Sequence, residues 1–310
     1  MEPMKLHILG CGSAKPANGH LPSCQVLEAR GKLFMIDCGE GAQMQWNRMG
    51  LGMTRLSHIF ITHSHGDHCF GLPGLISTMG LLGRTADLHI HAPADLKPFI
   101  DCTLNLFCNE MGYNVIFHEV DCTANQLVHE DRSVEVWSIP LRHRMPCSGY
   151  LFKEKPTLPH IRPEMLECYN IPVSQANNIK AGMDWTTEDG EVIPNSRLTR
   201  PADKPRSYAY CSDTLYTPSI ARMIEGCDVL YHEATFSDEF EVRAKQTCHS
   251  TARQAAMIAQ KAKVKKLVIG HYSGRIKDIE SHLGEAREVF LDTIASTEGL
   301  ILDFDTVVKK

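Results

Sequence analysis

The sequence lacks any apolar run long enough to form a membrane-spanning helix, which requires roughly 20 consecutive apolar residues. Its first residues, MEPMKLHILGCGS, also lack the basic segment and the long apolar stretch of a secretory signal peptide. We therefore expect a cytoplasmic protein with no membrane partner.

Cysteine pairs of the CxxC type are absent, although the chain contains 12 cysteines. This absence excludes a thiolate zinc site built on a CxxC motif. Disulfide frameworks are typical of small secreted domains, so we expect most of the cysteines to be reduced residues of the hydrophobic core.

An excess of positive charge is also missing, since the formal net charge is −5. The charge therefore gives no indication of a polyanionic partner, and we expect no binding to DNA. Hydrophobic residues at 43% and charged residues at 22% are typical of a soluble globular protein. A chain of 310 residues can form one large α/β domain or two smaller ones.

Hydrophobic patterning predicts strands over much of the chain, which in the second half alternate with helices. The expected strands are 4–10, 23–29, 32–39, 57–62, 87–93, 114–120, 133–141, 207–213, 227–235, 265–271 and 299–305. The expected helices are 39–50, 74–83, 95–112, 217–225, 250–263 and 281–291. This order of elements favours stacked sheets flanked by helices.

The composition changes between residues 153 and 206, where proline and polar residues are frequent. One short helix is predicted there, over RPEMLECYN, because a proline near its start fits the first helical turn. Long stretches of this kind are uncommon inside a compact domain, so we expect a protruding insertion. Its eight basic residues are balanced by eight acidic ones, so composition alone predicts no strong electrostatic attraction to nucleic acid.

Histidine is the abundant residue, with 16 in the chain, and three histidines stand together in the motif ITHSHGDH. His63 and His65 alternate along an extended backbone and therefore point to the same side. Beyond the turn at Gly66, Asp67 and His68 can reach a second point nearby. Imidazoles and carboxylates bind zinc and other borderline divalent metals, and two close sets fit a two-metal site with ions about 3.5–4 Å apart. The alternative is a histidine-rich surface turn.

Three further candidate ligands each follow an apolar strand: His143, Asp213 and His271. Any one of them alone could be a solvated residue or a helix cap. Their repeated position after apolar strands, together with the ITHSHGDH motif, favours a shared metal centre.

The pattern HxHxDH, formed here by His63, His65, Asp67 and His68, resembles the signature of the metallo-β-lactamase superfamily of hydrolases. Four other motifs are similar to those of the ribonuclease Z family, the tRNA 3′-processing endonucleases. They are LGCGS at 9–13, SDT at 212–214, HEAT at 232–235 and CHST at 248–251. The resemblance extends along the chain from Leu9 to about Asp303.

This resemblance implies an α/β fold, the αββα sandwich of the metallo-β-lactamase superfamily, formed by a single domain over residues 1–310. The segment 153–206 lies where the family carries a flexible arm, an exosite that grips the tRNA body. The family usually acts as a homodimer. We therefore expect this chain to form a homodimer. We also expect it to bind precursor tRNA as its substrate.

The resemblance also implies two zinc ions per subunit that share one aspartate. The ligands of the first ion would be His63, His65, His143 and Asp213. The ligands of the second would be Asp67, His68, His271 and Asp213. Zinc lowers the pKa of a bound water from about 15.7 toward about 7, so that hydroxide can attack phosphorus.

By the same resemblance, three residues would assist proton transfer. Asp67 would accept and orient the proton of the attacking water. His249, oriented by Glu233, would donate a proton to the departing 3′ oxygen. The products would be a 3′-OH on the tRNA and a 5′-phosphate on the trailer. From position alone, Glu233 could instead cap the next segment, and His249 could precede a helix that is capped by Ser250.

Four basic residues are candidates for substrate binding: Arg275, Arg197, Arg200 and Lys204. Arg275 could pair with a phosphate, and the other three could contact the RNA backbone, but each could equally be a solvated surface charge. The chain departs from the family after the first strand. There it reads KPANGHLPSCQ instead of the PxKxRN-like loop that meets the 3′ end of the tRNA.

Together these motifs predict a zinc-dependent endoribonuclease that cleaves precursor tRNA at its 3′ end. One alternative is a small-molecule phosphodiesterase or arylsulfatase-like hydrolase of the same superfamily, which would need no arm. Another is a non-catalytic RNA-binding or metal-sensing protein of this fold, and the intact ligand set with Asp67 argues against it.

Overall fold

The computed structural model describes residues 3–108 and 110–307. The expected domain limits of 1 and 310, and position 109 of the expected helix 95–112, lie outside the described residues. The chain divides into two compact units. The second unit is Glu154–Pro205, and the first combines the parts of the chain before and after it.

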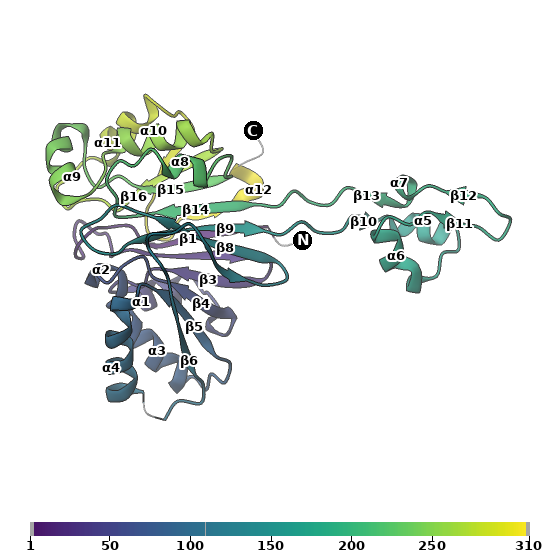
Figure 1. Ribbon diagram of the computed structural model, residues 1–310, viewed down its shortest axis with the longest axis horizontal. Helices are drawn as coiled ribbons and strands as arrows, with labels where there is room; N and C mark the ends of the chain where they lie inside the picture. Colours follow the sequence, from purple (N-terminus) through teal and green to yellow (C-terminus); the bar gives the residue numbers. More distant parts are fainter. Residues whose placement is uncertain (1–2, 109, 308–310) are drawn as a thin grey trace. The chain divides into compact units, whose positions relative to one another are not determined.

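Two seven-stranded sheets form the centre of the first unit (Figure 1). The first sheet has the order β18-β1-β2-β3-β4-β5-β6, antiparallel from β18 to β3 and parallel from β3 to β6. Its strands are β1 (Lys5–Gly10), β2 (Cys24–Ala29), β3 (Lys32–Ile36), β4 (Leu56–Phe60), β5 (Leu88–Ala92), β6 (Val115–Glu119) and β18 (Ile301–Asp303).

The second sheet has the order β17-β16-β15-β14-β9-β8-β7, and β14 to β17 are parallel. Its strands are β7 (Leu127–Glu130), β8 (Val134–Pro140), β9 (Ser148–Glu154), β14 (Ser207–Cys211), β15 (Val229–Glu233), β16 (Lys266–Gly270) and β17 (Thr293–Ala295). The parallel strands bring several of their carboxyl ends to one edge of the sheet, where side chains from distant parts of the sequence can meet.

Helices cover the outer face of each sheet, so the first unit is an αββα sandwich, as expected (Figure 1). Buried residues of the first sheet pack on α1 (Ala42–Arg48), α3 (Leu72–Leu81) and α4 (Lys97–Phe107). Those of the second sheet pack on α8 (Ile220–Met223), α10 (Ala252–Ala262) and α11 (Ile279–Arg287). The remaining helices of this unit are α2 (Gly66–Cys69), α9 (Glu241–Thr247) and α12 (Phe304–Val307). None of the helices in the described part of the chain has the length and apolarity that crossing a bilayer requires.

The inner faces of the two sheets meet in an aromatic core. Phe34 and Phe60 of the first sheet face Tyr150 and Phe152 of the second, and all four are fully buried. Alternation along each strand explains this arrangement, because neighbours such as Met35 point to the opposite, helix-covered face. These packed aromatic side chains therefore hold the two sheets at a fixed separation.

The second unit has a small core of its own, formed by Ile171, Ile179, Ile193 and Leu198. Its strands pair in two short ribbons, β10 (His160–Ile161) with β13 (Thr199–Arg200) and β11 (Trp185–Thr186) with β12 (Val192–Ile193). Its helices are α5 (Pro163–Cys168), α6 (Ala176–Lys180) and α7 (Asn195–Leu198). The expected helix over RPEMLECYN is α5, and α6 and α7 were not predicted.

Several short elements escaped the sequence pattern. The strands β7, β9 and β17 and the helices α2, α9 and α12 were not predicted, and α12 begins within the expected strand 299–305. β9 is almost wholly buried, so it shows no alternation of polar and apolar residues that would distinguish a strand. The expected helix over 217–225 is reduced to α8, and that over 95–112 to α4.

Candidate metal centre and catalytic residues

The candidate metal centre lies where strands of both sheets end. His63 follows β4, and His65 is the N-cap residue of α2. Asp213 follows β14 and His271 follows β16, and both have a left-handed backbone with φ of 61°. Non-glycine residues rarely adopt this conformation. Such strain is typical of functional sites, and it bends the chain directly after each strand.

Four of the predicted ligands form a first group of donors: His63, His65, His143 and Asp213. One donor atom from each lies within 4.8 Å of the others. His63 Nε2 is 2.9 Å from His65 Nδ1 and 3.6 Å from Asp213 Oδ2. His143 Nε2 is 3.4 Å from His65 Nδ1 and 3.8 Å from the same carboxylate oxygen. Two ligands of one tetrahedral zinc ion lie about 3.4 Å apart, so these spacings fit a shared cation.

A second group consists of Asp67, His68 and His271, again with one donor atom from each within 4.8 Å of the others. Asp67 Oδ2 is 3.5 Å from His68 Nε2 and 3.7 Å from His271 Nε2. Asp213 also faces this group, because its Oδ1 is 3.4 Å from His68 Nε2 and 3.1 Å from His271 Nε2. The two oxygens of Asp213 therefore point to different groups, as a bridging carboxylate would.

Two buried nitrogen atoms of the second group indicate that this group fits a metal ion. His68 Nε2 and His271 Nε2 are both buried and have no hydrogen-bond partner. Leaving such an atom unsatisfied costs about 1–3 kcal/mol of folding stability. A cation bound between these two nitrogens and the two carboxylates would remove that cost. The donor set of imidazoles and carboxylates is the one that zinc and similar ions prefer. The residues thus fit a divalent metal.

Hydrogen bonds behind the ligands fix the orientation of their rings. Asp37 Oδ2 accepts a 2.7 Å hydrogen bond from His68 Nδ1, so Nε2 of that ring is the atom turned inward. The same carboxylate accepts hydrogen bonds from the Thr62 backbone N–H at 2.9 Å and from the Tyr210 hydroxyl at 2.9 Å. Such outer partners set the tautomer and the basicity of a metal-binding histidine.

Asp37 was missed by the sequence reasoning. It directly follows β3, in the run FMIDCG, and a carboxylate at the end of an otherwise apolar strand was the available signal. The residue is fully buried, which a carboxylate tolerates only with several hydrogen-bond donors.

Charge in the centre is balanced between carboxylates and imidazoles. Burial raises the pKa of Asp67, but the nearby His68 and His271 outweigh that effect and hold the pKa well below its usual value. Burial raises the pKa of Asp213 as well, and His271, His68 and His63 together lower it further than burial raises it. Both aspartates are therefore ionised and can act as ligands and hydrogen-bond acceptors at neutral pH.

His249 and Glu233 form an ion pair beside the two donor groups. His249 Nδ1 is 2.9 Å from Glu233 Oε1, and its Nε2 is 4.0 Å from Asp213 Oδ2. Burial lowers the pKa of His249, but the charge of Glu233 and its hydrogen bond raise it to about 9. The ring is therefore protonated at neutral pH, which suits a proton donor better than a metal ligand.

Glu233 does not merely cap the segment that follows it. It is completely buried and accepts hydrogen bonds from the backbone N–H groups of Thr214 and Ser250, at 2.7 and 3.2 Å, as well as pairing with His249. The alternative in which Ser250 caps a helix is wrong. The N-cap of α10 is Thr251, whose side chain accepts a hydrogen bond from the Gln254 N–H in a capping box.

The loop 12–22, which includes most of KPANGHLPSCQ, lies against the centre. The Ala14 N–H donates a 2.7 Å hydrogen bond to Asp67 Oδ2. Beside it is a cavity of about 420 Å³ lined in part by Lys15, Asp67 and Phe70. The loop and α2 together thus shape the space next to the catalytic candidate Asp67.

A partly buried carboxylate near the C-terminal end of the chain holds this loop. Glu298 Oε1 accepts hydrogen bonds from the N–H groups of Leu21 and Cys11, at 2.9 and 3.3 Å. Its Oε2 is 2.9 Å from His20 Nδ1. Sequence reasoning missed Glu298, and no local pattern identifies it, because its partners lie more than 270 positions away.

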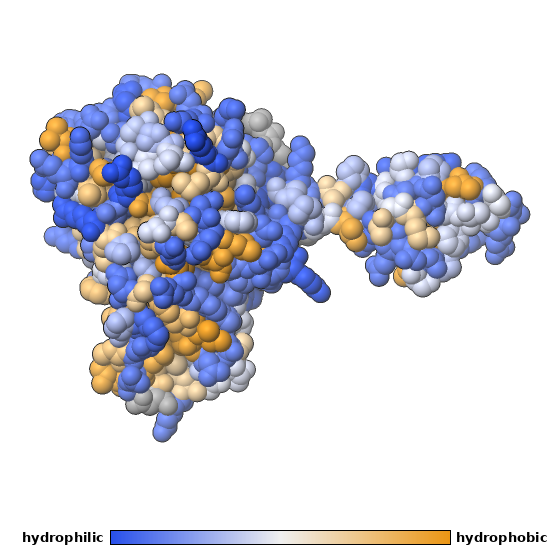
Figure 2. Space-filling view, in the orientation of Figure 1, coloured by the Kyte–Doolittle hydropathy of each residue, from blue (hydrophilic) through white to orange (hydrophobic). Residues whose placement is uncertain are grey.

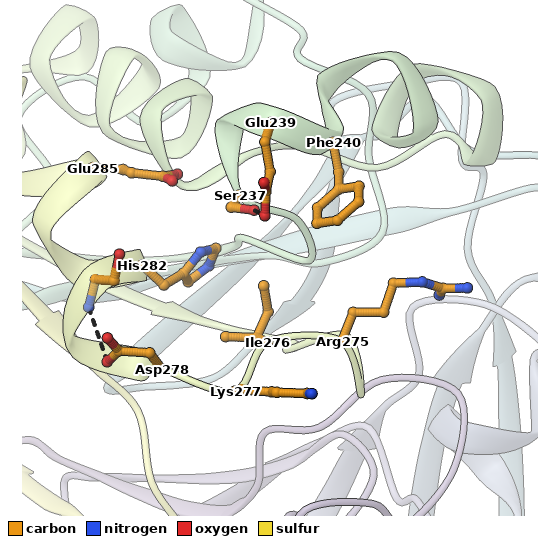
Figure 3. Close-up of a pocket in the computed structure, with 10 residues that line it drawn as sticks. Ser237, Glu239, Phe240, Arg275, Ile276, Lys277, Asp278, His282 and Glu285 are labelled. Carbon is orange, nitrogen blue, oxygen red and sulfur yellow. Dashed lines mark hydrogen bonds between the residues drawn. The ribbon is translucent and has the colours of Figure 1, made fainter.

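Arg275 lines a different cavity, of about 470 Å³, which also includes Phe240, Lys277 and His282. Figure 3 shows Arg275 and Phe240 at one side of this cavity, and His282 and Asp278 at the other. A guanidinium beside an aromatic ring can bind a phosphate and stack on a base. The binding of substrate by Arg275 stays a prediction.

The other predicted substrate-binding residues belong to the second unit. Arg197 is in α7, Arg200 is in β13, and Lys204 follows them; all three are exposed. The Arg197 guanidinium lies over the ring of Tyr169, 5.6 Å from its centre. Their contact with RNA remains a prediction.

Comparison with known proteins identifies relatives that match nearly the whole chain. A ribonuclease Z of Bacteroides fragilis is 55% identical over 302 residues, which are 97% of this chain and 99% of that protein. A ribonuclease Z of Porphyromonas gingivalis is 54% identical over 303 residues, 98% of this chain and 100% of that protein. A family model described as Anti-Pycsar protein Apyc1 matches residues 4–97.

Solved structures agree with these relatives. Human tRNase Z, short form, superposes with a TM-score of 0.71 at 25% identity, covering 97% of this chain and 99% of that one. The metallo-β-lactamase fold protein YhfI of Bacillus subtilis superposes with a TM-score of 0.67 at 17% identity, over 97% of this chain and 99% of that one, which supports the fold alone.

Proposed function

The chain belongs to the ribonuclease Z family, the tRNA 3′-processing endoribonucleases, and from this premise we propose how its residues share the reaction. The enzyme hydrolyses phosphodiester bonds in precursor tRNA. The observation that carries the assignment of roles is the position of Asp213, which faces both donor groups and lies 4.0 Å from the protonated His249. We place the reaction in the cytoplasm.

Two zinc ions per chain are proposed for the centre. One would be held by His63, His65, His143 and Asp213, and the other by Asp67, His68, His271 and Asp213. When bound, such ions lower the pKa of water and neutralise charge on phosphate oxygens. The buried, unpartnered Nε2 atoms of His68 and His271 support this ligand set.

Asp67 is proposed to accept the proton of the attacking water. Its carboxylate is ionised, and Oδ2 already accepts a hydrogen bond from the Ala14 N–H. That bond holds the carboxylate in one orientation, so its remaining lone pairs are directed at the site. Water attacks phosphorus directly, which leaves the 5′-phosphate on the trailer.

His249 is proposed to donate its Nε2 proton to the departing 3′ oxygen, which leaves a 3′-OH on the tRNA. The ring is protonated at neutral pH because Glu233 raises its pKa to about 9. The 2.9 Å contact with Glu233 at Nδ1 leaves Nε2 as the free donor and aims it toward the metal centre.

Substrate binding is proposed for Arg275 and for the second unit, Glu154–Pro205, as the arm that contacts the tRNA body through Arg197, Arg200 and Lys204. A homodimer is proposed as well. Large exposed apolar side chains on and beside α3 and α4, among them Leu81 and Phe107, are a feature of protein interfaces. Figure 2 shows hydrophobic surface in the part of the first unit where Figure 1 draws these helices.

An assay on a 3′-extended precursor tRNA, run beside bis(p-nitrophenyl) phosphate, tests the proposal. We expect one discrete cut next to the acceptor stem. The Asp67→Ala variant should cleave several orders of magnitude more slowly while binding RNA with little change, because a proton acceptor and metal ligand is lost. Normal turnover by this variant would remove Asp67 from catalysis. Hydrolysis of the small diester without tRNA cleavage would favour the small-molecule phosphodiesterase.

A further inference from the structure

A layer of histidines lies between the two sheets, away from the metal centre described above. His58 is on β4, His89 and His91 are on β5, His118 is on β6, and His129 faces them from β7. Strand register places His58 beside His89 and His91 beside His118. His58 precedes His63 by five residues, or about 16 Å along an extended strand, so the layer is separate from the catalytic ligands.

The layer packs against the aromatic inner core of the sandwich; His91 is buried, and the other four histidines are partly buried. Phe60 stacks on His91 with ring centres 4.4 Å apart, and the rings of His58 and His129 are 4.0 Å apart. Phe34, a fully buried residue of β3, is 6.1 Å from His129. An inner face that is aromatic elsewhere thus carries imidazoles where β4, β5 and β6 of the first sheet face β7 of the second.

Three of these histidines come together as a donor group. One ring nitrogen each of His58, His91 and His129 lies within 4.8 Å of the other two. His58 Nδ1 is 3.1 Å from His91 Nε2. Two nitrogens bound to one tetrahedral zinc ion lie about 3.4 Å apart, so this pair is a few tenths of an ångström from the spacing that a shared cation requires.

The hydrogen bonds of the layer leave polar atoms unsatisfied. His91 is only 2% exposed, and its Nδ1 has no hydrogen-bond partner. His129 Nε2 is buried and also has none; Asp131 Oδ2, at 3.7 Å, is beyond hydrogen-bond distance. Burial and the neighbouring imidazoles lower the pKa of His58 to about 3 and that of His91 to about 2, and burial lowers the pKa of His129. All three rings are therefore neutral at pH 7, the state in which imidazole binds metals.

We propose that His58, His91 and His129 bind a borderline divalent cation such as Zn²⁺, in a third metal site separate from the catalytic centre. Imidazole nitrogens select zinc, copper, nickel or cobalt over magnesium and calcium, which prefer oxygen. Asp131, held by Lys32, lies outside the three-histidine group but next to the His129 ring, and it can orient that ring.

A cation at this position would have a structural role. It would link β4 and β5 of the first sheet to β7 of the second, at the open edge of the sandwich. The competing explanation is that the imidazoles pack as ordinary neutral rings that share N–H···N hydrogen bonds. Two pairs have the spacing of that arrangement: His58 and His91, whose Nδ1 and Nε2 are 3.1 Å apart, and His89 and His118, at 2.9 Å. The second pair lies outside the three-histidine group.

This second pair provides a matched control. In His129→Phe a ligand is removed while an aromatic ring remains against Phe34 and His58. In His118→Phe a ring of the same layer is replaced, but the donor group stays intact. Both positions are partly buried, so the two substitutions disturb the packing to a similar degree.

The full-length protein would be stripped of metal, reloaded with Zn²⁺ or Co²⁺ and dialysed, and bound metal counted by mass spectrometry. We expect His129→Phe to hold one ion fewer per chain than the wild type, and His118→Phe to hold the wild-type number. In the cobalt-loaded proteins, the wild type minus His129→Phe difference spectrum should contain the visible bands of a tetrahedral nitrogen-bound ion. Adventitious zinc on the exposed Cys102 and Cys168 is common to all variants and cancels.

An equal metal count in the wild type and His129→Phe would overturn the site. If His129→Phe fails to fold, His58→Gln is counted in its place. As a second readout, Zn²⁺ added in excess of the catalytic equivalents should raise the thermal midpoint of the wild type and of His118→Phe but not of His129→Phe; a shift in all three would also overturn the site. These readouts do not involve tRNA cleavage, so the outcome is independent of the proposed function.

Discussion

At the residue scale, the buried carboxylate of Glu233 keeps His249 protonated, and this makes His249 able to donate a proton. Glu233 is completely buried, and an isolated carboxylate there would be costly. Backbone N–H groups and the protonated His249 offset that cost. The imidazolium in turn is stable at neutral pH only because of this carboxylate, so each partner depends on the other.

The His249→Ala variant should therefore lose most activity on substrates whose leaving group must be protonated as it departs. Cleavage of precursor tRNA, whose leaving 3′ oxygen is strongly basic, should slow by 10²–10⁴-fold, roughly the usual contribution of general acid catalysis. Hydrolysis of bis(p-nitrophenyl) phosphate should change far less, because nitrophenolate departs without a proton. Equal losses on both substrates, measured as kcat, would contradict donation by His249.

The pH profile follows from the same pair. His249 donates only when protonated, and Glu233 raises its pKa to about 9, so the donor is present at neutral pH and is lost as pH rises through about 9. For the wild type we expect kcat on tRNA to fall above this pH.

At the element scale, the catalytic residues occupy short turns that follow rigid strands. β4, β14 and β16 are buried strands of two packed sheets, and their register fixes the positions from which His63, Asp213 and His271 extend. The loop 12–22 is less embedded and is tied to the rest by a few hydrogen bonds. Its contacts with Glu298 are among those that fix where the loop lies against the centre.

Replacing that attachment should affect turnover through the loop. In Glu298→Gln an amide replaces the carboxylate that accepts from the Leu21 and Cys11 N–H groups and pairs with His20. We expect the Ala14 contact to Asp67 to loosen and kcat on tRNA to fall by roughly tenfold, with near-normal folding, since one charge-assisted network is weakened. Unchanged kcat and KM in steady-state kinetics would show that the loop needs no such anchor.

The sequence predicted the elements that carry a local signal. The run SHIFIT before ITHSHGDH, and the apolar strands before Asp213 and His271, have patterns that identify a strand end. The structure brings these residues together as predicted. Glu298 was not predicted, because its partners lie far away in the sequence, and the buried strand β9 has no alternating pattern. Asp37 directly follows an apolar strand, which is a local signal, but its role depends on a contact with His68, 31 positions later.

At the scale of the whole molecule, the chain joins a catalytic unit and a small second unit, Glu154–Pro205, with a core of its own. The second unit is inserted between two paired strands. Lys153 of β9 and Ser207 of β14 are register partners in an antiparallel ladder, so the two points of insertion are one strand spacing apart, about 5 Å. The insertion can therefore be removed and the strands rejoined by a short hairpin turn.

A variant in which residues 156–204 are replaced by a short Asn-Gly turn tests what the second unit does. The first unit keeps all seven predicted metal ligands, so hydrolysis of bis(p-nitrophenyl) phosphate should stay within about twofold of the wild type. If the unit is the tRNA-binding arm, KM for precursor tRNA should rise by at least tenfold, because binding energy from remote parts of the substrate is lost. Wild-type kinetics on tRNA would exclude an exosite here. Loss of activity on both substrates with an intact circular dichroism spectrum would instead mean that the insertion supports the catalytic centre itself.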